Sequence, residues 1–159
     1  MAEAFPERGP MRRREFIVAL CGAAGWSLPL AAQPSRKPFR IGVLLPGTPA
    51  SFSLRTKALL EGLAALGYIE GSTIEIDWKW GQDRVDVLPG LAQELVRNKV
   101  DVIVTGGTPA AKALKDATGV IPIVMAIIGD PVTAGLVDSL AQPGGNATGV
   151  SFLTVELAP

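Results

Sequence analysis

The sequence predicts an α/β fold in which a parallel β-sheet is sandwiched between helices. Short apolar runs rich in β-branched residues alternate along the chain with segments whose apolar positions follow the helical period. The order strand, helix, strand repeats between residues 39 and 152. Such alternation is typical of parallel sheets with right-handed crossovers. Strands are expected at residues 39–45, 74–79, 100–105, 121–128 and 149–152.

The first half of this region contains two expected strands with a helix between them. The run Phe39–Leu45 ends at a Pro-Gly-Thr-Pro sequence, which breaks the strand. Ser51 or Ser53 can cap the following helix, which we expect to end near residue 66. The apolar stripe expected to pack on the sheet comprises Leu54, Ala58, Gly62 and Leu66.

The second strand alternates apolar and polar residues, so one of its faces should be wetter than the other. Trp78 and Trp80 lie two positions apart and therefore share one face of this strand. We interpret the pair as packed by a helix or a neighbouring element, in preference to an aromatic clamp for a ligand.

The second half continues the alternation. Asp86 can cap a helix whose apolar positions run over residues 88–96. The run Val100–Thr105 is almost entirely apolar, which favours a central strand covered on both faces. Pro109 suits the first turn of the next helix, where its missing N–H costs little. A short helix is expected over Ala134–Leu140 before the last strand.

The first 32 residues have the organisation of an export signal. A basic stretch, Met11–Ile17, precedes the uncharged apolar segment Ile17–Ala32, and residues 33–38 form a polar linker. The apolar segment is too short, and too interrupted by glycine and proline, to span a membrane well. Arg13 and Arg14 begin a sequence that resembles the twin-arginine export consensus. We therefore expect a cleaved signal over residues 1–32, a periplasmic product, and translation from Met1 or Met11.

Composition excludes several classes of function. Without residues 1–32 the chain has 11 basic and 12 acidic residues, so nothing favours a nucleic-acid partner. The chain has no histidine, so it lacks the commonest general base and the commonest metal ligand. Its one cysteine, Cys21, lies in the signal segment, so the mature chain can form no disulfide. No acidic cluster has the spacing of a metal site. We expect no disulfide, no metal and no cofactor.

Two corners between a strand and the next segment suit a small polar ligand. Thr105-Gly106-Gly107-Thr108 connects an apolar strand to a helix, at the edge of the sheet where α/β folds bind ligands. Glycine permits close backbone approach, and a helix start supplies N–H groups and partial positive charge. A carboxylate or phosphate would fit there, with the two threonine hydroxyls as further donors. The alternative is a tight turn in which threonine caps the helix.

Asp130 occupies the second corner, between Gly129 and Pro131. Its carboxylate can accept a hydrogen bond from a ligand amine, or it can cap the following turn. Thr48, after the first strand, can face the same edge or belong only to the turn beside Pro49.

The sequence does not contain either of two common nucleotide-binding motifs. The stretch from Gly106 to Lys112 lacks the glycine before the lysine and the hydroxyl residue after it that a P-loop requires. No Gly-x-Gly-x-x-Gly sequence follows the first strand.

Three sequence runs, GGTPAAKAL, GDPVTAGLV and PGGNATGVSF, occur in this order within the second half of the chain. Together with their spacing they resemble the substrate-binding proteins of bacterial ABC importers, in the branch similar to tryptophan- and tyrosine-binding components. The resemblance covers residues 40–152. It implies one lobe of a type I periplasmic-binding-protein fold over residues 39–152, with residues 153–159 beginning a second lobe.

The resemblance also implies a function. The partners would be a small-molecule ligand, such as an amino acid or another carboxylate, and an ABC permease in the membrane. Candidate ligand-binding residues are Thr48, Thr105, Gly106, Gly107, Thr108 and Asp130, and no catalytic residue is implied. Family members are roughly twice this length, so two alternatives stay open: a small exported α/β enzyme that uses the glycine corner as an anion hole, and a non-functional fragment.

Overall fold

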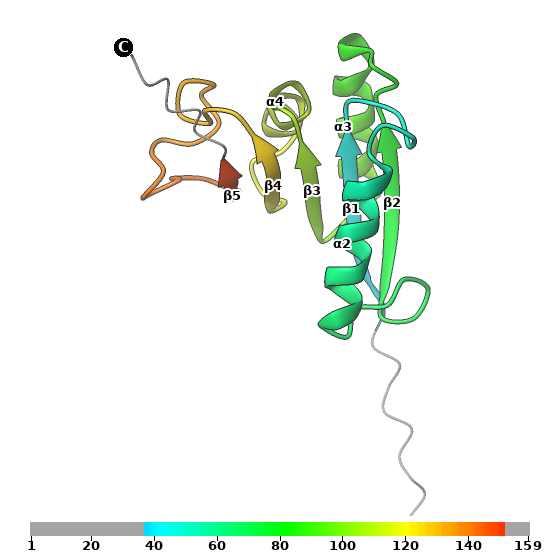
Figure 1. The fold of residues 1–159 in the computed structure, drawn as a ribbon. Coiled ribbons are helices and arrows are strands. Elements are labelled where there is room, and N and C mark those ends of the chain that lie inside the picture. Colours follow the sequence, from blue (N-terminus) through cyan, green and yellow to red (C-terminus); the bar gives the residue numbers. More distant parts are fainter. Residues whose placement is uncertain (1–36, 152–159) are drawn as a thin grey trace, which may run out of the picture. The chain divides into compact units, whose positions relative to one another are not determined.

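A computed structural model describes residues 37–151 (Figure 1). The strands are β1 (Phe39–Leu45), β2 (Ile74–Trp80), β3 (Val102–Gly106), β4 (Ile123–Ile128) and β5 (Ala147–Ser151). The helices are α2 (Ser53–Ala65), α3 (Leu88–Arg97) and α4 (Thr108–Ala117), with a 3-10 turn, η1 (Val85–Val87), before α3. The expected export signal and the expected start of a second lobe lie outside the described residues.

The five strands form one parallel sheet in the order β2-β1-β3-β4-β5. Helix α2 covers one face of the sheet, and α3 and α4 cover the other (Figure 1). The predicted class, a parallel sheet between helices, is confirmed, and the strand expected to be central is β3, in the middle of the order.

The larger core lies under α3 and α4. Their small and branched side chains pack on strand residues that are fully buried, which lets both helices sit close to the sheet. The cluster includes Leu44, Leu88, Ala92, Leu95, Ile103, Ala110, Leu114 and Ile123. None of the helices in residues 37–151 has the length and apolar character needed to cross a bilayer.

Helix α2 packs on the sheet through a different face from the one expected. Leu54 and Leu66 are 82% and 75% exposed, so the stripe Leu54, Ala58, Gly62 and Leu66 was the wrong one. Phe52, Leu59 and Leu63 pack against β1 and β2 instead. Both sets follow the helical period, and the sheet takes the set with larger side chains because it removes more apolar area from water.

Both expected side-chain caps were also wrong. The N-cap of α2 is Phe52, with no capping side chain, and the Ser51 hydroxyl bonds instead to the carbonyl oxygen of Thr48 at 3.0 Å. Asp86 lies in η1, where its carboxylate pairs with Arg84 at 2.8 Å, and α3 begins two residues later.

The segment 134–140 forms turns rather than the expected helix. Gly135 has a φ of 70°, which ends any helical turn there. The N–H of Leu136 donates to Pro131 O at 2.9 Å, and that of Asp138 donates to Pro143 O at 3.1 Å. The turns are thus closed by hydrogen bonds to the residues that precede and follow them. The apolar residues that suggested a helix, Leu136 and Val137, are nevertheless buried in the main core.

Candidate functional site

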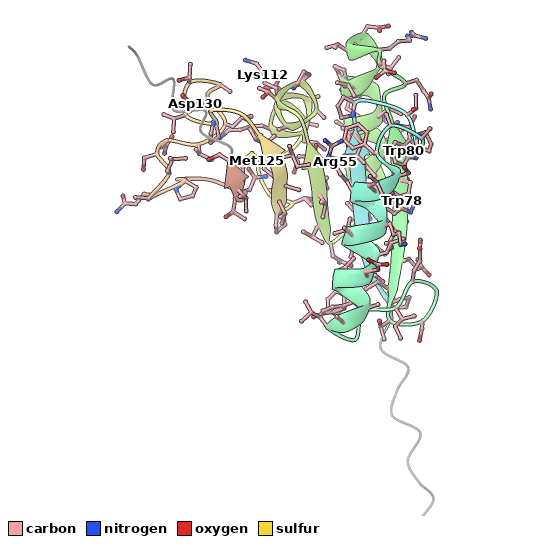
Figure 2. All side chains as sticks on the ribbon, in the orientation of Figure 1. Arg55, Trp78, Trp80, Lys112, Met125 and Asp130 are labelled. Carbon is pink, nitrogen blue, oxygen red and sulfur yellow. The ribbon has the colours of Figure 1, made fainter. Side chains whose placement is uncertain are left out.

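The loops after β1, β2, β3 and β4 all emerge at one edge of the sheet because the strands are parallel. We call this the carboxyl edge and define it as residues 46–48, 81–83, 106–108 and 129–130. All six candidate ligand residues belong to it or, in the case of Thr105, directly precede it. Figure 2 shows Asp130 and Lys112 at the end of the sheet toward which the strand arrows point.

Gly107 is the N-cap of α4, with a φ of 86° and a ψ of 135°. The positive φ strains any residue other than glycine, and a side chain at this position would also make a tight contact with Pro46 Cγ at 3.2 Å. The N–H of Gly107 donates to Ile127 O at 2.7 Å, which ties the corner to β4. Gly106 has space for a methyl group, whose nearest neighbour would be Leu45 Cδ2 at 3.4 Å.

Helix α4 begins at Thr108 without a capping side chain. The interpretation in which threonine caps this helix is therefore wrong, because Thr108 is the first helical residue and Gly107 has no side chain to offer. The opening N–H groups and the positive end of the helix dipole face the carboxyl edge. This arrangement suits an anionic group.

Thr105 has a structural task. Its side chain is fully buried, and its hydroxyl donates to Leu44 O at 2.8 Å across the β1–β3 pair. It does not reach the carboxyl edge, so the expectation that Thr105 is an extra donor to the ligand was wrong.

Thr48 is part of a compact turn. Its N–H donates to Ser51 Oγ at 3.0 Å, and the Ser51 N–H donates to Thr48 Oγ1 at 3.3 Å. These bonds hold Thr48, half-buried, beside Gly47 at the carboxyl edge. The Thr48 hydroxyl also donates to Ser51 Oγ at 3.3 Å, so it can bind a ligand only as an acceptor, and neither interpretation of Thr48 is contradicted.

Asp130 caps the turn that follows β4. One carboxylate oxygen accepts from the N–H groups of Val132 and Thr133, at 3.0 and 3.2 Å, and the other is bonded to the Thr133 hydroxyl. The Thr133 hydroxyl, followed by its N–H, lowers the pKa of the Asp130 carboxyl below its ordinary value. Asp130 thus stays ionised, exposed and fixed in direction at the carboxyl edge.

The two tryptophans pack as expected. Their rings stack at 5.8 Å with an interplanar angle of 6°, and Phe52 lies 6.4 Å from Trp80. Both are partly buried and pack, like Leu59 and Leu63 of α2, against the core cluster that includes Val43 and Ile74. The packing interpretation is confirmed.

The sequence did not single out the loop after β2, which also reaches the carboxyl edge. The N–H groups of Gly81, Gln82 and Asp83 donate to Leu45 O, Gly47 O and Pro46 O, at 2.7, 3.1 and 2.8 Å. Gln82 and Asp83 have positive φ angles of 53° and 59°. Gly81 was the available signal, since a side chain there would meet the Pro46 carbonyl oxygen at 2.6 Å.

The chain is similar to known proteins of one family. The family model described as ABC transporter substrate binding protein matches residues 40–157. A tyrosine-binding protein of Clostridioides difficile is 37% identical over 123 residues, which are 77% of this chain and 36% of that protein.

Two solved structures share the fold. A conserved domain protein from Vibrio cholerae superposes with a TM-score of 0.71 at 39% identity, over 75% of this chain and 40% of its own. An ABC domain from Streptococcus pneumoniae, solved in complex with L-Trp, gives a TM-score of 0.67 at 38% identity, over 72% and 39% of the two chains. The chain thus spans well under half the length of these relatives, and it belongs to the ABC transporter substrate binding protein family.

Proposed function

We propose that this chain is the ligand-binding lobe of an ABC importer's substrate-binding protein and holds an amino acid at its carboxyl edge. The observation that carries the proposal is the uncapped start of α4 beside the Gly106-Gly107 corner, with the ionised Asp130 on the neighbouring strand end. One end of this site favours an anion and the other a cation. An α-amino acid carries both charges on one carbon.

The proposed ligand class draws on the relatives. One of them is named for tyrosine and another was solved with L-Trp. In our proposal the ligand carboxylate accepts hydrogen bonds from the first N–H groups of α4 and from the Thr108 hydroxyl. The ligand ammonium lies toward Asp130, and Thr48 offers its hydroxyl from the loop after β1.

The proposal extends to the rest of the transport cycle. Relatives are more than twice as long, and their additional chain would supply the opposing wall of a cleft that closes on the ligand. The complete protein would then deliver the ligand to an ABC permease. Residues 1–32 would direct the chain to the periplasm, with residues 33–38 as linker. The edge would bind and release without catalysis or a cofactor.

Ligand titration of the chain, followed by NMR, tests the proposal. Amide resonances of the loops 46–48, 106–110 and 129–133 should shift on addition of L-tryptophan or L-tyrosine. Tryptamine lacks the carboxylate and indole-3-propionate lacks the ammonium, so each should shift fewer of these resonances. No change with either amino acid at millimolar concentration would refute amino-acid binding by this edge.

A further inference from the structure

The turn after β2 has a backbone that its sequence does not explain. Arg84 N–H donates to Gly81 O at 2.9 Å, closing a four-residue turn whose two central residues, Gln82 and Asp83, both have positive φ. That combination defines a type I′ turn, which favours Asn or Gly at its centre. Asp is tolerated in the left-handed region because its short side chain bonds locally, but Gln is not favoured there. The strained residue is therefore Gln82.

The strain is held in place by the rest of the carboxyl edge. Three N–H groups of this turn donate to the carbonyl oxygens of residues 45–47, and Gln82 itself binds Gly47 O at 3.1 Å. Gly47 directly precedes Thr48, and Pro46 lies against Gly107. Gln82 is thus fixed next to the residues that we assign to the ligand. Strained residues persist where the surroundings impose them, and they cluster at binding sites.

The side chain of Gln82 is exposed, and within residues 37–151 Gln82 is hydrogen-bonded through its backbone N–H and not through its amide. Thr105, Thr48 and Asp130 each make at least one side-chain hydrogen bond within the chain, to Leu44, Ser51 and Thr133 respectively, so Gln82 differs from them in having its whole amide free for a ligand. An amide offers both a donor and an acceptor, which matches a ligand that carries an ammonium beside a carboxylate.

From this we infer that Gln82 is a further ligand-binding residue, whose side-chain amide hydrogen-bonds the charged head of the amino-acid ligand. The inference rests on the proposed function and adds a contact from the β2 side of the edge. The need for the amide explains why glutamine occupies a strained position in this turn. The three backbone bonds hold the backbone of Gln82 in this conformation in the unliganded chain.

Two substitutions separate the amide from the strain. Gln82→Gly removes both, so the melting temperature should stay the same or rise. Gln82→Leu removes only the amide and keeps the strained backbone. Both should weaken L-tryptophan binding by roughly ten- to a hundredfold, the loss of one hydrogen bond to a charged group, as measured by NMR titration of the full chain.

Lys99 provides a matched control. It is exposed, polar and also has a φ of 53°, but it lies before β3 at the opposite edge of the sheet. Lys99→Gly should change the melting temperature as Gln82→Gly does and leave L-tryptophan binding unchanged. Affinity that stays at the wild-type value in both Gln82 variants overturns the inference, and so does affinity that simply follows the melting temperature.

Two further outcomes distinguish this inference from its basis. A loss of affinity in Asp83→Gly, with none in the Gln82 variants, would move the contact to the neighbouring residue and overturn the assignment to Gln82. A wild-type chain whose resonances do not respond to L-tryptophan or L-tyrosine would instead refute the proposed function, and the inference with it.

Discussion

The hydroxyl of Thr105 donates a 2.8 Å hydrogen bond to the carbonyl oxygen of Leu44, between two fully buried residues of adjacent strands. Threonine at this position of β3 therefore stabilises the sheet directly behind the carboxyl edge. Thr105→Val keeps the shape and removes the bond, and it should lower the free energy of unfolding by about 1 kcal/mol or somewhat more.

Denaturant unfolding measures that loss, with Thr105→Ser as the control that retains the hydroxyl. Ligand affinity of the folded Thr105→Val chain should equal that of the wild type. If Thr105→Val instead lowered ligand affinity without changing stability, Thr105 would have to contribute to ligand binding.

The two glycines of the corner should respond differently to alanine. Gly107→Ala imposes a side chain on a backbone that glycine alone adopts readily, with Pro46 Cγ 3.2 Å away, and should cost roughly 1–3 kcal/mol of stability. Gly106→Ala meets only ordinary contacts and should be near neutral in stability. Thermal unfolding of the pair checks the difference, and equal losses would contradict it.

Thr108→Ala should separate binding from stability. The Thr108 side chain does not cap α4, so its removal leaves the helix intact and should change the melting temperature little. If its hydroxyl donates to the ligand carboxylate, affinity for L-tryptophan should fall by roughly 1.5–3 kcal/mol, and affinity for tryptamine should not change. Parallel losses for both ligands would place the hydroxyl away from the carboxylate.

The carboxyl of Asp130 should titrate below its ordinary pKa because the Thr133 hydroxyl and N–H stabilise its charged form. A folded-state pKa that is depressed adds stability above the unfolded pKa, and this contribution disappears as the pH falls through the folded pKa. Thr133→Val should raise the pKa of Asp130 and reduce this acid-dependent contribution. NMR of the Asp130 carboxyl carbon below pH 7 follows the titration, and an unchanged midpoint in the variant would contradict the assignment.

The export prediction concerns residues outside the described part of the chain. Replacing Arg13 and Arg14 together by lysine should leave the precursor in the cytoplasm if the twin-arginine route is used. Cell fractionation followed by immunoblotting compares precursor with mature chain. Normal export of the double variant would indicate another route, and export that survives deletion of residues 1–32 would remove the signal altogether.

Much of the fold could be predicted because buried parallel strands are nearly continuous apolar runs, as in Ile123–Ile128. The packing face of α2 could not, because its sequence carries two apolar stripes and only the sheet decides between them. The turns at 134–140 were missed because Leu136 and Val137 are buried without being helical, and Gly135 alone signals the break.

The positions of the candidate site residues could be predicted only in part for a similar reason. The glycine corner and Asp130 have recognisable sequences, and both lie at the carboxyl edge. Whether a hydroxyl faces the carboxyl edge or the neighbouring strand depends on the register between strands. In the β1–β3 pair this register sets Thr105 beside Leu44, and the Thr105 hydroxyl donates to Leu44 O. Glutamine in a type I′ turn contradicts local preference, so propensity arguments did not predict the backbone of Gln82.

The three backbone bonds between residues 45–47 and 81–83 have a consequence for how binding preferences can diverge in such a protein. An inserted or deleted residue in either loop would misalign every one of these pairs, so loop length is constrained on this side of the edge. If Gln82 contacts the ligand as we infer, binding preference can change by exchange of exposed side chains on an unchanged backbone. Engineering a new specificity here should therefore begin with saturation of single positions rather than with grafted loops.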